Sequence, residues 1–101
     1  MQIQLMDTNE GFEVRNEANE QLGKIVWKLG DGVMLMNGTL VDPSLRGQNV
    51  GEKLLNEAAD FARKNGYKML AVCPYVVKKF AESSAYDDVK EIIGGVAENV
   101  A

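Results

Sequence analysis

The stretch from Asn37 to Gly51 constrains the fold of this chain more than any other. Thr39-Leu40-Val41 favours an extended strand, and Asp42 is kept out of the helical region because a proline follows it. Further on, apolar residues recur at helical spacing: Leu54, Leu55, Ala58, Phe61 and Ala62. The stretch therefore predicts a strand, a short turn and an amphipathic helix running from about residue 50 to residue 64.

The turn between this strand and this helix is rich in small and polar residues, from Arg46 to Gly51. The first turn of a helix has unpaired backbone N–H groups and a partial positive charge, so the junction is suited to holding a phosphate. It is neither a nucleotide P-loop, which needs a following Gly-Lys-Ser/Thr, nor a complete dinucleotide fingerprint. The same residues also suit an ordinary turn that binds nothing.

Short strands are predicted before this junction. Ile3 and Leu5 alternate with polar residues, which suggests an edge strand. The alternative for residues 1–11 is a loosely ordered segment. Further strands are expected around Phe12 and Val14, over 22–29 and over 33–41. Gly30-Asp31-Gly32 provides a tight hairpin between the last two, and the glycine at 38 indicates a bulge. These strands would form an antiparallel meander.

After the long helix, the nearly all-apolar segment 67–73 predicts a strand buried on both faces, which gives a parallel βαβ unit. Pro74 is suited to open a second helix. The apolar side of that helix would be Val76, Val77, Phe80 and Ala81. A last short helix, capped by Ser83 or Ser84, would carry Val89, Ile92 and Ile93, with a loose tail from Gly94. The expected fold class is thus α+β, with a mixed sheet in one domain.

Composition excludes several classes of function. The 101 residues are 46% hydrophobic and carry a net charge of −4 with no histidine, so nucleic-acid binding is not expected. No segment is long and apolar enough to be a signal peptide or a membrane span. One cysteine excludes an internal disulfide, favours a cytoplasmic location and cannot support zinc. Magnesium would need carboxylate ligands, and no clustered acidic motif argues for them, so we expect no metal site.

The order Arg46-x-x-Asn49-x-Gly51 after a strand ending Val-Asp-Pro resembles the acetyl-CoA pyrophosphate loop of the GNAT N-acetyltransferase superfamily. Cys73-Pro74-Tyr75 and Tyr86 stand where small single-domain members have a Cys-Pro-Tyr and a later tyrosine. The resemblance covers about residues 12–90. Two departures stand out. Asn49 replaces a glycine, and asparagine is the non-glycine residue most tolerant of left-handed geometry; Gly38 and Leu40 replace a histidine and a glutamate.

The resemblance implies an acetyl-CoA-dependent N-acetyltransferase that acts on an unidentified amine of a small molecule, peptide or protein. The diphosphate would accept backbone hydrogen bonds at residues 48–51 with help from Arg46, and the pantetheine arm would lie along the 40–41 strand edge. The implied cofactor-binding residues are Leu40, Val41, Arg46, Gly47, Gln48, Asn49, Val50, Gly51 and Glu52. Arg46 could instead pair with a local carboxylate.

Three residues are candidates for chemistry. Cys73 precedes a helix N-terminus, where the dipole favours a thiolate that could act as nucleophile or base, although a lone cysteine also serves as a small core residue. Tyr75 and Tyr86 could each return a proton to the leaving thiolate, or simply pack their rings. Core positions are expected for Trp27, Met34 and Met36, although the methionines could also line an acyl site.

Two other functions remain open on the sequence: a non-catalytic acyl-CoA-binding or sensing module, and an interaction domain whose turn binds nothing. Members of the resembled superfamily usually carry N-terminal helices beside the acceptor site, and we expect this short chain to lack them. The acceptor groove would therefore be open, or completed by a second subunit, and we expect a monomer or a weak homodimer.

Overall fold

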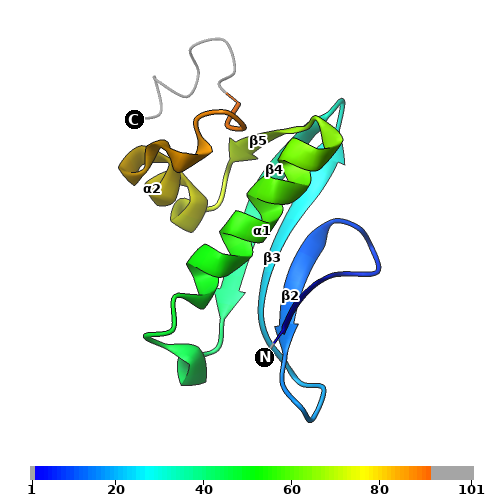
Figure 1. The fold of residues 1–101 in the computed structure, drawn as a ribbon, viewed down its shortest axis with the longest axis vertical. Helices are drawn as coiled ribbons and strands as arrows, with labels where there is room; N and C mark the ends of the chain where they lie inside the picture. The colour runs from blue at the N-terminus through cyan, green and yellow to red at the C-terminus, as the bar shows by residue number, and fades with distance from the viewer. Residues whose placement is uncertain (1, 92–101) are drawn as a thin grey trace.

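The computed structural model describes residues 2–91 and shows a five-stranded sheet with strand order β1-β2-β3-β4-β5. The first four strands are antiparallel, and β5 pairs parallel to β4. The helix α1 lies across one face of the sheet, and α2 lies at its β4–β5 end (Figure 1). The predicted mixed α+β fold is confirmed. The elements are β1 Gln2–Leu5, β2 Gly11–Arg15, β3 Gln21–Gly30, β4 Val33–Val41, η1 Pro43–Leu45, α1 Val50–Asn65, β5 Lys68–Ala71, α2 Pro74–Glu82 and η2 Ser84–Tyr86.

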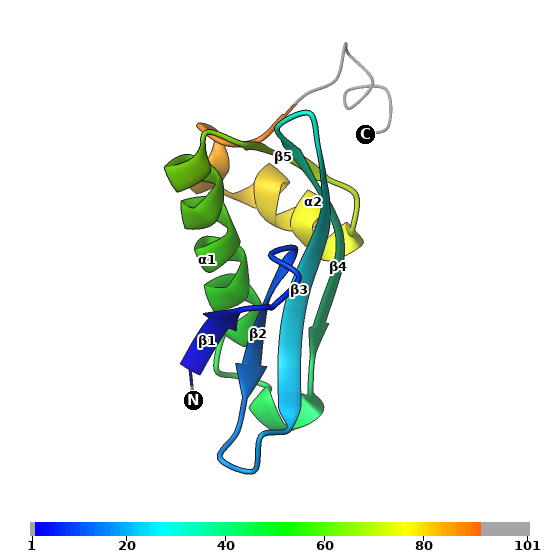
Figure 2. The same ribbon diagram turned by 90° about the vertical axis from the view of Figure 1, so that its right-hand side faces the viewer.

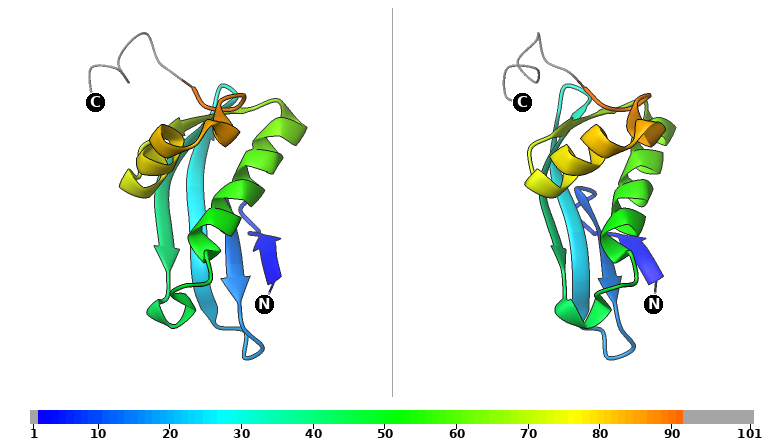
Figure 3. Two further views of the ribbon diagram at one scale, coloured as in Figure 1. Left: turned by 60° about the vertical axis from the view of Figure 1, so that its left-hand side comes forward. Right: turned by 90° about the vertical axis from the view of Figure 1, so that its left-hand side faces the viewer.

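The core lies between α1 and the sheet (Figure 3). Trp27, Met34 and Met36 are at most 2% exposed, which confirms their predicted core positions. The apolar stripe of α1 is buried against them, except that Phe61 is only partly buried and packs its ring 5.4 Å from Trp27. Burial of this stripe is the main force that holds α1 on the sheet.

Two turns set the geometry of β4. Asp31 and Gly32 have φ angles of 52° and 77°, as a two-residue hairpin of the predicted kind requires. Later, Val26 pairs with Gly38 but Trp27 pairs with Met36, so Asn37 is an extra residue on β4. The bulge predicted near Gly38 is therefore confirmed.

The strands β4 and β5 separate directly at this bulge. Their pairing ends with Met36 opposite Ala71, and the N–H groups of Val72 and Cys73 both donate to the Met36 carbonyl, at 3.1 and 2.8 Å. Within the described residues, the β5-side edge of β4 from Asn37 to Val41 has no partner strand. The two strands therefore splay apart after Met36 and Ala71.

Three predictions for the C-terminal part are wrong. The strand β5 is not buried on both faces, because it lies at the end of the sheet and only Met69 is fully buried. Val77 is 47% exposed and Ala81 is also exposed, because the short α2 turns only the face of Val76 and Phe80 to the core.

The prediction of a last helix is also wrong, because residues 84–91 contain only a short 3₁₀ turn. Ser83 does act as a cap, since its hydroxyl accepts from the N–H of Ala85, but the 3₁₀ turn η2 ends at Tyr86. The chain then turns, and Lys90 forms a parallel bridge with Met69. Ile92, Ile93 and the tail from Gly94 lie outside the described residues. No helix in 2–91 is long and apolar enough to span a membrane.

Candidate functional site

The junction between β4 and α1 is held by local hydrogen bonds. The Asp42 carboxylate caps η1 by accepting the N–H of Ser44 at 2.9 Å, and this bond lowers the pKa of Asp42. Gly47 and Asn49 then adopt left-handed φ angles of 87° and 55°. The prediction that Asn49 tolerates left-handed geometry is confirmed, so this loop folds without the missing glycine.

The N-terminus of α1 presents free backbone donors. The Asn49 side chain makes no capping bond, and the first intrahelical bond runs from Lys53 N–H to the Asn49 carbonyl at 3.0 Å. The N–H groups of residues 49–52 therefore have no acceptor within the described residues. The Gln48 N–H donates to the Leu45 carbonyl at 3.2 Å, so Gln48 does not belong to this set of free donors.

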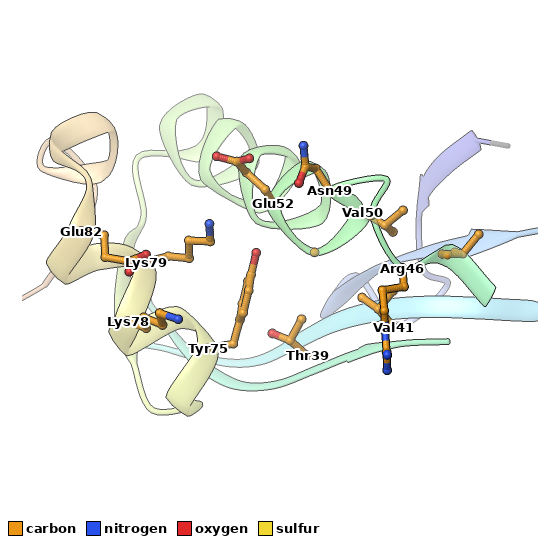
Figure 4. Close-up of a pocket in the computed structure, with 13 residues that line it drawn as sticks. Thr39, Val41, Arg46, Asn49, Val50, Glu52, Tyr75, Lys78, Lys79 and Glu82 are labelled. Carbon is orange, nitrogen blue, oxygen red and sulfur yellow. The ribbon is translucent and has the colours of Figure 1, made fainter. Parts of the chain in front are cut away.

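Residues 49–52 line an open cavity of about 500 Å³ between the N-terminus of α1, the free edge of β4 and one side of α2 (Figure 4). The cavity thus joins three segments that are far apart in the sequence. Its lining residues are Thr39, Val41, Leu45, Arg46, Gly47, Asn49, Val50, Gly51, Glu52, Tyr75, Lys78, Lys79 and Glu82.

Tyr75 lies between α1 and β4 in this cavity (Figure 4). Its hydroxyl approaches Gly51 so closely that a Cβ atom on Gly51 would lie 3.0 Å from it. Burial, followed by the nearby Glu52 carboxylate, raises the pKa of Tyr75. The phenol therefore remains protonated at neutral pH and can donate a proton.

Cys73 is 8% exposed and immediately precedes α2. Burial is the largest influence on its thiol and raises the pKa, but hydrogen bonds from the Thr39 hydroxyl and the backbone N–H groups of Val76 and Tyr75 together lower it. Cys73 Sγ lies 3.6 Å from Thr39 Oγ1. Thr39 lines the cavity and Cys73 does not, so the thiol lies one side chain behind the cavity wall.

The structure does not bring Tyr86 into the cavity. Its ring is 3% exposed and packs 5.4 Å from that of Phe80, and its hydroxyl donates to Asn56 Oδ1 at 2.6 Å. The hydroxyl is thus bonded within the protein. This arrangement gives Tyr86 a role in joining η2 to α1 rather than a position beside reacting atoms.

Leu40 also departs from the predicted site. Its side chain is 61% exposed and does not line the cavity, because alternation along β4 directs it to the sheet face away from α1. Only its backbone lies on the free edge. Five lining residues were not predicted from the sequence: Thr39, Leu45, Lys78, Lys79 and Glu82. Helical spacing from Tyr75 could have indicated the last three, since they follow it at three, four and seven residues.

The chain is similar in sequence and in fold to known proteins. Residues 11–89 match the family model for GCN5-related N-acetyl-transferase. A GCN5-like protein from Staphylococcus aureus, solved in solution, is 27% identical, with a TM-score of 0.73 over 89% of this chain and 87% of its own. No curated protein matches the sequence.

Two more distant structures share the fold. An acetyltransferase from Bacillus cereus has a TM-score of 0.59 at 23% identity, over 75% of this chain and 63% of its own. The N-acetylglutamate synthase from Neisseria gonorrhoeae, complexed with coenzyme A and N-acetyl-glutamate, has a TM-score of 0.62 at 21% identity. The match covers 91% of this chain but 22% of the synthase, which is a much longer protein.

The sheet of this chain opens beside a strand-to-helix junction with free donors, and the family model and structural neighbours define its class as an acyltransferase. The chain belongs to the GCN5-related N-acetyltransferase family, whose model matches most of its length.

The structural role of Tyr86 can be tested by replacing it with phenylalanine. We expect Tyr86→Phe to lower the free energy of unfolding by about 1 kcal/mol, because it removes the hydrogen bond to Asn56. For a domain of this size, that corresponds to a fall in Tm of roughly 4–8 °C. Urea unfolding and a thermal melt measure the loss. Coenzyme A affinity should stay unchanged, and a ten-fold loss of that affinity would instead place Tyr86 at the site.

Proposed function

We propose that the protein is an acetyl-CoA-dependent N-acetyltransferase that binds the cofactor diphosphate at the N-terminus of α1. The observation that carries the proposal is the set of unpaired N–H groups at residues 49–52, which line the cavity. A helix N-terminus with open donors is favourable for a phosphate group. The structural neighbour complexed with coenzyme A supports the same ligand for this fold.

The residues around the cavity fit such a ligand. Arg46, Lys78 and Lys79 provide positive charge, which outweighs the carboxylates of Glu52 and Glu82 in number. The free edge of β4 offers backbone groups with which the amides of the pantetheine arm can pair, as an added strand would. The thioester end would then reach the bulge of β4, beside Thr39 and Cys73.

Two side chains carry the proposed chemistry. The amine acceptor attacks the thioester carbonyl directly, or the Cys73 thiolate attacks first and passes the acetyl group on. In either route the carbon–sulfur bond to coenzyme A breaks, Tyr75 gives its phenolic proton to the leaving thiolate, and the proton that the attacking amine loses returns through water to the tyrosinate. The raised pKa of Tyr75 and the lowered pKa of Cys73 support these assignments. The acceptor itself is an amine of unassigned structure.

A non-catalytic acyl-CoA-binding module is the second candidate. One observation favours it: β4 carries no acidic residue and no histidine, and Gly38 and Leu40 stand where resembled enzymes have a histidine and a glutamate. The same cofactor site serves both functions. A cytoplasmic location and a monomer or weak homodimer remain predictions from the sequence.

The experiment that tests the proposal is a titration of coenzyme A followed by backbone amide resonances. We expect the largest shifts at residues 46–52 and at Tyr75, and unchanged resonances at the far end of α1 near Gly66. Absence of binding, or shifts centred elsewhere, would overturn both candidates. Intact-mass analysis with labelled acetyl-CoA and a panel of amines then separates the two, since only a transferase forms acetylated amine.

A further inference from the structure

The sheet face opposite α1 is open in the part of the chain that the structure describes (Figure 2). Residues in register across antiparallel strands point to the same face of the sheet. On β3, Lys24 and Lys28 alternate with the buried Ile25 and Trp27. Their partners in register on β4 are Leu40 and Leu35. These pairs therefore lie on the open face. Because β3 is the middle strand of the five, its two lysines occupy the centre of that face.

A stripe of exposed apolar side chains runs beside these lysines. Leu35 and Leu40 on β4 are 39% and 61% exposed, and Val72 after β5 is 52% exposed. Leu70 pairs with Leu35 and extends the stripe onto β5. Grouped apolar side chains on an otherwise solvated face mark an interaction surface. We call the set of Lys24, Lys28, Leu35, Leu40, Leu70 and Val72 the open face.

The open face adjoins the opening between β4 and β5. Gly38 lies on this face beside Val26, and having no side chain it leaves the edge of the bulge uncovered. On the other side of the sheet, the cavity reaches Thr39, which contacts Cys73. Coenzyme A bound in that cavity would fill the helix side, so an acceptor has to approach the thioester from the open face.

Charge determines what kind of partner fits this surface. The nearby acids are already bonded: Glu13 to Gln21 and Arg15 at 2.8 and 3.1 Å, and Glu10 to the N–H of Leu29 at 3.0 Å. Lys28 is 3.8 Å from Glu10 with its side chain 73% exposed, and within residues 2–91 Lys24 forms no ion pair. Glu13 is the cross-strand neighbour of Lys24, so the face carries Lys24, Lys28 and Arg15 against Glu10 and Glu13, a small positive excess in a chain whose net charge is −4.

This charge argues against a second copy of the chain as the occupant. Two open faces packed together would bring the lysines of one central strand against those of the other, which costs free energy because Glu10 and Glu13 are already bonded within each copy. A small molecule is also a poor fit, because small ligands are held in concave sites and this surface is an open sheet. An extended peptide with carboxylates beside apolar side chains complements both the lysines and the leucines.

We propose that the open face docks the acceptor as an extended peptide segment in which acidic and apolar residues alternate next to the reactive amine. Its carboxylates pair with Lys24 and Lys28, and its apolar side chains cover Leu35 and Leu40. The proposal rests on the proposed N-acetyltransferase function only in one respect, namely that the docked peptide carries the amine that accepts the acetyl group. Docking itself is a property of this face and can be measured without turnover.

The test uses the full chain and three peptides of equal length that alternate leucine with glutamate, lysine or serine. Binding is followed by backbone amide shifts with and without coenzyme A. We expect the glutamate peptide to bind at least ten-fold more tightly than the lysine peptide, with shifts at residues 24–28 and 35–40. Lys24→Glu should weaken glutamate-peptide binding at least ten-fold. Lys64→Glu, an equal charge change on exposed α1, should leave it unchanged.

Several results would overturn the inference: equal binding of the glutamate and lysine peptides, shifts confined to the helix side, or equal losses in the two variants. A dimer in sedimentation equilibrium whose formation protects residues 24–28 would assign the face to a second copy instead. Coenzyme A affinity is measured separately on each variant. If the unmodified chain does not bind coenzyme A, the proposed function is wrong. If it binds coenzyme A but does not discriminate between the peptides, only this inference is wrong.

Discussion

Replacing Gly51 by valine is expected to lower the affinity for coenzyme A at least about 100-fold, or roughly 2.7 kcal/mol, while the protein still folds. Gly51 lies in the first turn of α1, and even a single Cβ atom there would stand 3.0 Å from the Tyr75 hydroxyl and 3.1 Å from Tyr75 Cζ. The branched side chain would therefore displace Tyr75 and cover the free donors. Isothermal titration with coenzyme A measures the loss, and circular dichroism checks the fold.

Gly30→Val is the matched control. A Cβ atom on Gly30 meets nothing within 4 Å, and this residue lies at the end of β3 away from the cavity. We expect its coenzyme A affinity to equal that of the unmodified protein. In a double-mutant cycle, Tyr75→Ala should recover part of the loss caused by Gly51→Val, because it removes the clashing ring. Wild-type affinity in Gly51→Val would show that the diphosphate binds elsewhere.

The local parts of this fold could be predicted from sequence because their causes are local. The turn at Asp31, the proline that opens α2 and the apolar stripe of α1 each specify their own geometry. Burial of β5 could not be predicted in this way. An apolar run predicts a strand, but whether that strand is central or terminal depends on the neighbours it acquires in the sheet.

The same distinction holds for the site. The donor loop is contiguous in sequence, and its residues 46–52 line the cavity except for Gln48. Tyr86 was assigned from its position in a motif, and only the three-dimensional contact with Asn56 shows that its hydroxyl is already bonded. Lys78 and Lys79 were missed because lysines on an exposed helix are ordinary surface residues. Their relation to the α1 N-terminus arises only when α2 packs beside it.

The role of Cys73 gives the second large expected effect. If the buried thiolate takes part in acetyl transfer, Cys73→Ala should lower turnover at least about 100-fold, in the range that removal of a nucleophile or general base produces. Coenzyme A affinity should change little, because Cys73 does not line the cavity. Intact mass after acetyl-CoA alone, without amine, shows whether an acetyl group rests on this residue. Undiminished turnover in Cys73→Ala would make the thiol a core residue only.

Thr39 provides the pH test of the same role. Its hydroxyl is among the hydrogen-bond donors that lower the pKa of Cys73 against the opposing effect of burial. Removing it in Thr39→Val should raise that pKa, so the thiolate forms only at higher pH and the acidic limb of the pH–rate profile moves toward alkaline pH. Thr39→Ser keeps a hydroxyl and should keep the original limb. If the acidic limb stays in place in Thr39→Val while Cys73→Ala is inactive, the limb reports the titration of another group. That group cannot be Tyr75, because a phenol with a raised pKa that must be protonated limits activity only on the alkaline side.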